Sequence, residues 1–205
     1  MEPTVGRLGL TTTEIGVAAA AAALLSGSWA VVNATDDVPE LEVQVFIALN
    51  GLPDPLWPVV WAPVQVGSLG GSLLAVVGTG IATRSVPLTL ATLLASQGAY
   101  WGAKVVKHLA ARARPVDVLA RVRVRERATG LGYVSGHAAV ASALAVVLVA
   151  ETTGVWRVVP LVVAATVGIG RVYAGVHLPL DVVGGIGLGI LAGLAGRWGG
   201  VHMAR

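Results

Sequence analysis

Apolar runs of membrane-crossing length recur along the chain and constrain its fold more than any other feature. A helix needs about 20 mostly apolar residues to cross the hydrocarbon core of a bilayer. Several stretches meet or approach that length, and only 12% of the residues are charged, against about a quarter in soluble domains. The sequence therefore predicts an all-α, polytopic membrane protein whose six transmembrane helices form a bundle. The predicted segments are Glu14–Asn33, Trp57–Thr83, Val86–Ala110, Gly136–Thr153, Val155–Tyr173 and Leu178–Trp198.

The stretch between the first two segments has a different composition. Residues 36–55 mix apolar side chains with acidic ones. This spacing favours a short amphipathic helix at the membrane interface, ended by Pro53 and Pro55, although an ordinary loop is also compatible with it. The sequence contains no internal repeat, so residues 1–205 are expected to form one integral membrane domain.

Three further features bear on the possible chemistry, on the N-terminal segment and on the connections between helices. The chain has no cysteine, which excludes disulfides, thiolate metal ligands and a cysteine nucleophile. The first apolar run, residues 15–32, is too long for the apolar core of a cleaved signal peptide, so we interpret it as a retained anchor. Connections are short except for Ala111–Val134, the loop with room for chemistry outside the membrane.

Small residues recur in the last predicted segment. Gly185, Gly189 and Gly193 are spaced four apart, which places them along one side of a helix. Such faces let membrane helices approach closely, and we expect this one to pack against another helix of the same molecule.

Polar residues at the ends of several apolar segments are unusual for membrane helices. Ionisable groups in such positions are energetically unfavourable and are usually paired or functional. If six helices alternate in direction, all these positions fall on the same face of the membrane. The residues are Lys107, Arg114, Ser135, His137, Arg171, His177 and Asp181.

Two of these segment ends have the features of an anion site. Lys107 and Arg114 are two helical turns apart and so share a face, and Pro115 favours a helix exit at Arg114. Ser135 is a good N-cap for the fourth segment, and the amides that follow an N-cap have no partner within the helix. An anion bound at this helix start would lie beside His137.

The third feature is a histidine followed by a carboxylate. Pro179 suits the first turn of the sixth segment, which places His177 just before the helix and Asp181 within reach of its ring. Cations and free amides suit phosphate oxygens, a histidine held by a carboxylate suits a nucleophile, and a second histidine suits a general acid. Each histidine taken alone is more simply interpreted as a polar residue at a helix entry. The interpretation as a catalytic site therefore rests on the combination of the two histidines with the carboxylate and the cations.

Three short motifs resemble those of a known family. Lys107–Pro115 is similar to the pattern K-x6-R-P, Ser135–His137 to P-S-G-H, and Arg171–Asp181 to S-R-x5-H-x3-D. In this order and membrane placement they resemble the signature of the type-2 phosphatidic acid phosphatase superfamily, over about residues 86–198.

The resemblance implies a role for each matching residue. His177 would attack phosphorus, Asp181 would orient it, and His137 would protonate the leaving oxygen and then activate water. No metal and no other cofactor is implied. The chain departs from the pattern at Val134, where the family has proline, and at Gly170, where it has serine. The phosphate would be held by Lys107, Arg114, Ser135, Gly136 and Arg171.

These features predict a membrane lipid phosphatase that releases a terminal phosphate or diphosphate group through a phosphohistidine. Polyprenyl diphosphate, phosphatidic acid and similar lipids all fit the predicted site. One alternative is a phosphotransferase, in which a lipid alcohol replaces water as acceptor. Others are a non-enzymatic anion-binding or transport protein, and a metal hydrolase that uses His137, His177 and Asp181 as ligands.

The interpretation as a membrane lipid phosphatase also predicts the partners and the location of the protein. We expect a lipid phosphate and the surrounding membrane lipids as partners, and no nucleic acid, while the oligomeric state is not predicted. Once the site residues are set aside, Lys and Arg are nearly balanced between the two sets of loops, so charge does not orient the protein. The resemblance implies a multi-pass protein of the cell membrane with its site on the extracytoplasmic face.

Overall fold

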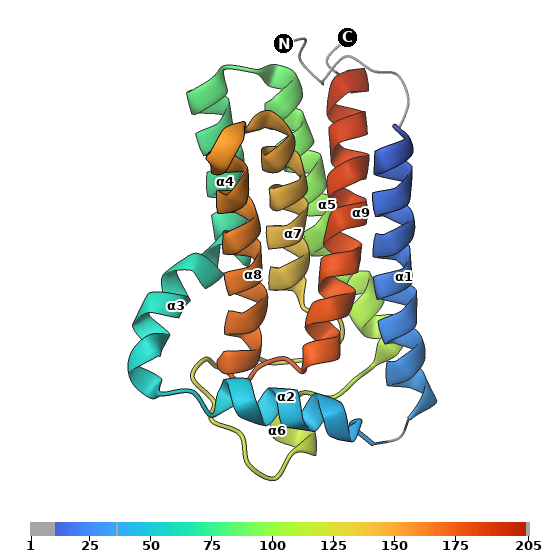
Figure 1. The fold of residues 1–205 in the computed structure, drawn as a ribbon, viewed down its shortest axis with the longest axis vertical. Helices are drawn as coiled ribbons and strands as arrows, with labels where there is room; N and C mark the ends of the chain where they lie inside the picture. The colour runs from blue at the N-terminus through green and yellow to red at the C-terminus, as the bar shows by residue number, and fades with distance from the viewer. Residues whose placement is uncertain (1–10, 36, 204–205) are drawn as a thin grey trace.

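The protein is an upright helical bundle closed at one end by a transverse helix. The computed structural model describes residues 11–35 and 37–203, which contain helices and turns and no strand. The long axis of the bundle is vertical in Figure 1, and α2 crosses its lower end. The bundle helices are α1 (Thr12–Ala34), α4 (Leu69–Thr83), α5 (Val86–Ala110), α7 (Gly136–Glu151), α8 (Val158–Tyr173) and α9 (Pro179–Met203). The shorter ones are α2 (Glu40–Asn50), α3 (Trp57–Val64) and α6 (Pro115–Val118).

Helix α9 is the centre of the bundle because its glycines admit close neighbours. It packs against α5, α7 and α1. A Cβ added at Gly185 would lie 2.5 Å from the carbonyl oxygen of Ser135, and Gly189 and Gly193 face α7 in the same way. The predicted small-residue face is therefore confirmed as an intramolecular contact between α9 and α7.

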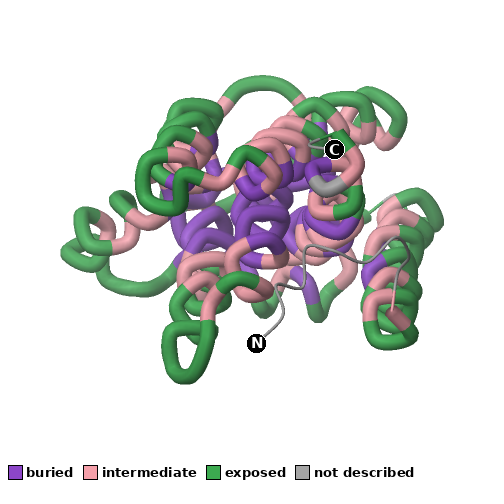
Figure 2. Tube along the Cα trace, turned by 90° about the horizontal axis from the view of Figure 1, so that it is seen from above, coloured by how far each residue is buried: buried purple, intermediate pink, exposed green. Residues whose placement is uncertain are grey.

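The burial pattern is that of a bundle surrounded by apolar solvent. Buried residues gather along the bundle axis and exposed ones face outward (Figure 2). Many of the exposed residues are large and apolar, such as Leu74, Ile81 and Leu161. An all-α membrane protein, as predicted from the sequence, agrees with this pattern.

Length and hydropathy support fewer spans than the six predicted. Within the described residues, α1, α9 and the run Gly154–Tyr173 are long and apolar enough to cross a membrane, and α3 with α4 adds a fourth span if the bent pair counts as one. Helix α5 is long enough but more polar. Helix α7 has 16 residues, a length of about 24 Å, and is short for a span.

The second predicted segment, residues 57–83, is broken in the structure. The chain bends by 68° between the stretch Asp54–Gly67 and helix α4. Pro63 lies inside α3, and the hydroxyl of Ser68 caps α4 by accepting a hydrogen bond from the Gly71 amide at 3.0 Å. A proline followed by an N-cap ends one helix and starts another, which hydropathy alone does not reveal.

The short helix predicted between the first two segments is confirmed as α2, which ends at Asn50. One face of α2 is buried through Glu42, Phe46 and Asn50, whereas Leu41 and Ile47 are exposed. Phe46 belongs to an apolar cluster with residues of α7, α8 and α9. Helix α2 thereby covers the end of the bundle where the predicted site residues lie.

Candidate functional site

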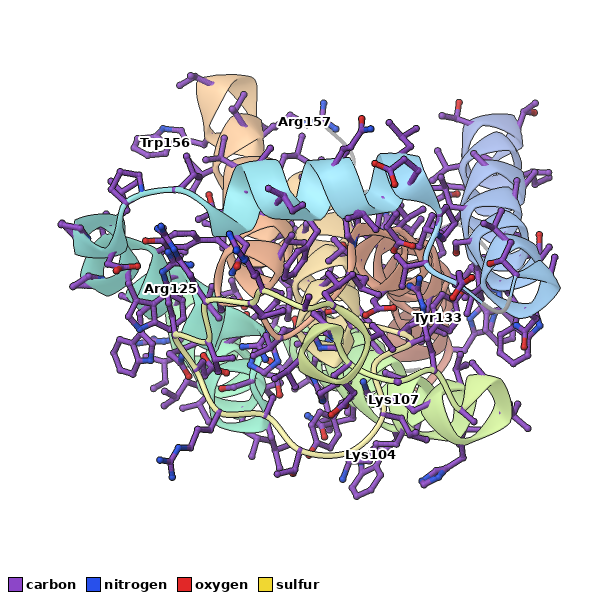
Figure 3. The ribbon with its side chains drawn as sticks, turned by 90° about the horizontal axis from the view of Figure 1, so that it is seen from below. Lys104, Lys107, Arg125, Tyr133, Trp156 and Arg157 are labelled. Atoms are coloured by element: carbon purple, nitrogen blue, oxygen red, sulfur yellow. The ribbon has the colours of Figure 1, made fainter. Side chains whose placement is uncertain are left out.

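The residues singled out from the sequence gather at the end of the bundle covered by α2. They come from the last turn of α5, the start of α7, the last turn of α8, the start of α9 and, for Arg114, the loop. The prediction that Lys107 and Arg114 share a helix face was wrong, because α5 ends at Ala110, Ala111 is left-handed and Arg114 is extended. Figure 3 looks onto this end, where α2 and the loop 111–135 lie side by side. The predicted convergence at one face of the bundle is thus seen in the fold.

The histidine–carboxylate pair is fully enclosed. His177 Nδ1 lies 3.2 Å from Asp181 Oδ2, which also accepts a hydrogen bond from the Leu178 amide at 2.9 Å. His177 and Asp181 are 2% and 0% exposed. The turn before them needs Gly175, whose φ is +78° and whose missing side chain leaves room for the Arg123 carbonyl.

Burial controls the protonation of His177. Removal from water lowers the pKa of His177 to about 3, and its hydrogen bond to Asp181 only partly opposes this. The imidazole is therefore neutral near pH 7. Because Nδ1 faces the carboxylate, the lone pair of the other ring nitrogen, Nε2, is available for chemistry.

The start of α7 lies beside this pair. Ser135 caps α7 by accepting a hydrogen bond from the Ala138 amide at 3.4 Å, and its own amide donates to the Asp181 carbonyl at 2.8 Å. The amides of Gly136 and His137 have no acceptor within the helix. The ring of His137 is partly exposed and lies within electrostatic range of Arg171 and His177.

Two of the predicted phosphate ligands also hold the loop together. Lys107 Nζ donates to the carbonyls of Leu131 and Gly132, both at 2.9 Å. Arg114 donates to three carbonyls, of which that of Val176 is the nearest at 2.6 Å. An ammonium has three N–H donors and a guanidinium five, so Lys107 keeps one donor and Arg114 two for an anion.

The third predicted cation, Arg171, is held by an acid that the sequence did not single out. Its guanidinium forms a short ion pair with Glu126 of the loop. Arg171 Nε and Glu126 Oε2 are buried without a hydrogen-bond partner among the described residues. Unsatisfied buried polar atoms are rare and need an explanation, and here both belong to one ion pair in the candidate site.

Two further charged residues of the site were not predicted from the sequence. Arg112 donates to Asp181 Oδ1 at 2.9 Å and forms an ion pair with Glu42 of α2 at 2.6 Å. The position of Arg112 inside the motif Lys107–Pro115 was an available signal for it. The sequence offered no signal for Glu42, since its partner lies 70 residues away.

The alternating arginines of the loop differ in their surroundings. Arg125 is enclosed, pairs with Asp54 at 2.6 Å and lies over the ring of Tyr173 at 4.0 Å. It joins the loop to the ends of α2 and α8 through the carbonyls of Asn50 and Tyr173, so its role is structural. Arg121 and Arg127 are exposed.

The structure gives a physical reason for one of the two departures from the family pattern. A Cβ at Gly170 would lie 2.6 Å from a methyl group of Val64 and 2.8 Å from one of Val60. Glycine at this position therefore lets α3 pack closely against α8, where a serine would collide. Val134 is fully buried and follows a cis peptide bond.

A helical membrane bundle whose ionisable residues meet at one end, under the transverse helix α2, defines the class to which this protein belongs. Within that class the chain is a member of the PAP2 superfamily, whose family model matches residues 85–200. The resemblance stated from the three motifs is therefore confirmed.

Similar proteins agree with this membership. An undecaprenyl-diphosphatase of Sulfolobus acidocaldarius is 36% identical over 87 residues, so the match spans 42% of this chain and 42% of that relative. The crystal structure of Aquifex aeolicus LpxE superimposes with a TM-score of 0.72 at 22% identity, over 79% of this chain and 98% of that one.

A second solved structure is similar over more of the chain. The transmembrane PAP2-type phosphatidylglycerolphosphate phosphatase of Bacillus subtilis has a TM-score of 0.71 at 20% identity, over 91% of this chain and 95% of that one. At 22% and 20% sequence identity, the two solved structures show that the fold is shared.

Proposed function

We propose that this protein is a membrane lipid phosphatase that removes a terminal phosphate or diphosphate group through a phosphohistidine on His177. The observation that carries the proposal is the buried, neutral His177 held by Asp181 beside His137. Membership of the PAP2 superfamily supports phosphatase chemistry.

In the first proposed step, His177 Nε2 attacks phosphorus. The P–N bond forms as the P–O bond to the lipid breaks, and His137, protonated once the anionic phosphate is bound beside it, gives its proton to the departing oxygen. Asp181 stabilises the positive charge that develops on the ring of His177. The spare donors of Lys107 and Arg114, the α7 amides and Arg171 would hold the phosphate oxygens.

In the second step, water completes the cycle. Neutral His137 takes a proton from water as the water oxygen attacks phosphorus, and the P–N bond breaks to release phosphate and neutral His177. Each proton and electron pair is accounted for by these two histidines and water, so the proposed cycle needs no metal ion.

The relatives point to the substrate class. A diphosphatase acting on a polyprenyl lipid and a phosphatidylglycerolphosphate phosphatase are both similar to this chain. Both proteins are named for a lipid with a terminal phosphate. We therefore propose a lipid carrying a phosphomonoester or diphosphate end group, with a polyprenyl diphosphate as the first candidate.

The membrane arrangement is part of the proposal. We propose that residues 1–205 form one domain with six spans: α1, the bent pair α3–α4, α5, α7, α8 and α9. The Bacillus structure supports a single domain, because the similarity covers 91% of the chain. We place the α2 end on the extracytoplasmic face of the cell membrane.

Phosphate release tests the function. The chain purified in detergent should release phosphate from at least one of polyprenyl diphosphate, polyprenyl phosphate, phosphatidic acid and phosphatidylglycerol phosphate, with and without chelator. Loss of activity in chelator, restored by a divalent ion, would favour the metal alternative. Transfer to a lipid alcohol without phosphate release in its absence would favour the phosphotransferase.

Trapping the intermediate tests the mechanism. With nitrophenyl phosphate, whose leaving group needs no acid, His137→Ala should accumulate an acid-labile, alkali-stable phosphoenzyme that His177→Ala never forms. Rapid quench followed by intact-mass measurement detects it. A phosphoenzyme in the His177 variant would reverse the assignment of the two histidines.

A further inference from the structure

A chain of buried charges connects the interfacial helix α2 to the histidine–carboxylate pair. Arg112 NH1 donates to Asp181 Oδ1 at 2.9 Å and to Glu42 Oε1 at 3.0 Å, and Arg112 NH2 donates to Glu42 Oε2 at 2.6 Å. One guanidinium nitrogen thus binds both carboxylates. The oxygen of Asp181 that Arg112 contacts is the one that does not face His177.

All three charges are withdrawn from solvent. The side chains of Glu42, Arg112 and Asp181 are 3%, 11% and 0% exposed. Glu42 Oε1 also accepts a hydrogen bond from the amide of Leu180, in the first turn of α9, at 2.8 Å. Helix α2 therefore supplies a carboxylate both to the guanidinium and to the helix that carries Asp181.

We propose that Arg112 and Glu42 are positioning residues for the His177–Asp181 pair, so that α2 is part of the catalytic machinery. Arg112 keeps the carboxylate of Asp181 ionised and directed at His177 Nδ1, and Glu42 fixes Arg112. This inference rests on the proposed function, since it assigns how the same site holds its nucleophile.

The physical reason is the repulsion that Arg112 relieves. Without its guanidinium, the carboxylates of Glu42 and Asp181 would be buried near each other with no cation between them, which favours uptake of a proton at this pair. A proton on Oδ2 of Asp181 would point at His177 Nδ1. The imidazole would then carry its own proton on Nε2, the nitrogen that must attack phosphorus.

Other charged groups face this pair, but they do not replace Arg112. Among the described residues, the Asp181 carboxylate accepts hydrogen bonds from Arg112, His177 and the Leu178 amide. The remaining groups act on the pair without a hydrogen bond to it. They are Lys107 of α5, Arg114 and Tyr133 of the loop, His137 of α7, and Arg171 of α8 with its partner Glu126.

Four variants test the proposal against a matched control. They are Arg112→Gln, Arg112→Lys, Glu42→Gln and the double variant Glu42→Gln/Arg112→Gln. The control is Arg121→Gln, which removes an exposed arginine from the same loop. Each full-length variant is purified in the same detergent and checked for folding by thermal unfolding, and kcat and KM are measured from pH 5.5 to 9.

The expected result is a pH-dependent loss in kcat. At pH 6, kcat of Arg112→Gln should fall about tenfold or more and recover at high pH, while KM stays within about threefold. Arg112→Lys should keep the wild-type pH profile, since it restores the charge. The double variant should regain activity at pH 6 because one of the two competing carboxylates is gone. Glu42→Gln should lower kcat by less than Arg112→Gln, and Arg121→Gln should match the wild type.

Three activity results would overturn the proposal. One is an Arg112→Gln variant with wild-type kcat and pH profile. Another is a raised KM with unchanged kcat, which would make Arg112 a phosphate ligand. The third is a loss at all pH values that Glu42→Gln does not rescue, which would make the network structural.

A measurement without substrate keeps the inference separate from the proposed function. Nitrogen NMR of 15N-histidine-labelled protein reports which ring nitrogen of His177 carries the proton, with His177→Gln giving the assignment. At pH 6 the proton should be on Nδ1 in the wild type, Arg121→Gln and the double variant, and should shift toward Nε2 in Arg112→Gln. An unchanged tautomer in Arg112→Gln would refute the positioning role, even if no lipid phosphate proved to be a substrate.

Discussion

The ion pair between Glu126 and Arg171 predicts that removing Glu126 strengthens anion binding. Arg171 is 3% exposed, its guanidinium is paired with Glu126, and its Nε has no partner among the described residues. A phosphate that binds Arg171 in the proposed way competes with this carboxylate. We therefore expect Glu126→Gln to bind vanadate and phosphate more tightly than the wild type.

The magnitude follows from the geometry of the pair. Two unit charges about 4 Å apart interact by about 4 kcal/mol at an effective dielectric constant of about 20. The Glu126 side chain is 25% exposed, so it regains hydration when it is displaced, and the net competition is reduced to about 1–2 kcal/mol. Since about 1.4 kcal/mol is tenfold in binding, dissociation constants should fall about five- to thirtyfold.

Vanadate inhibition is the assay, because its five-coordinate form resembles the phosphoryl transition state. The control is Asp54→Asn, which removes an acid paired with Arg125 of the same loop but far more exposed, at 73%. Unchanged or weaker inhibition of Glu126→Gln would show that the carboxylate stays on Arg171 when an anion binds. If both variants gained the same affinity for vanadate, the effect would come from the change in net charge and not from the loss of the Glu126–Arg171 ion pair.

Three other expectations follow from the geometry. Asp181→Asn should lower kcat at least a hundredfold, since a comparable loss of the carboxylate beside a catalytic histidine gives about 10⁴, while vanadate binding is retained; full activity would make the carboxylate structural. Gly189→Ala should destabilise the fold by about 1–3 kcal/mol, because its Cβ would collide with the α7 backbone, and thermal unfolding should show no such loss for Gly78→Ala, which has open space. Because the chain has no cysteine, Thr129→Cys gives a single label site, and an impermeant maleimide should label it in intact cells; labelling only after permeabilisation would place the site in the cytoplasm.

Local sequence patterns predicted most of the fold because the forces behind them are local. Hydropathy over 20 residues, an N-cap at Ser135 and a proline at position 179 act within one helix, so the bundle helices and their ends could be placed from the sequence. Where two local signals conflicted, the prediction failed. Hydropathy favoured one helix over residues 57–83, whereas Pro63 and Ser68 divide it.

In the candidate site, too, the sequence predicted what depends on local spacing and missed contacts between distant residues. Motif spacing brought together Lys107, His137 and the His177–Asp181 pair, because these residues lie at or beside helix ends whose alternation sets the membrane face, and Arg114 follows in the loop after α5. The spacing did not show that the loop carbonyls already engage donors of Lys107 and Arg114. Those contacts depend on how the loop 111–135 folds back over the bundle.

The sequence by itself determined the class of protein, the helices and the residues that resemble a phosphatase motif. Only the tertiary structure decided which charges pair. Arg112 meets Glu42 across 70 residues and Asp181 across 69, and Arg171 meets Glu126 across 45. An ion pair has no sequence period, since its energy depends on the distance and burial of two side chains that the packing of α2, α8, α9 and the loop brings together.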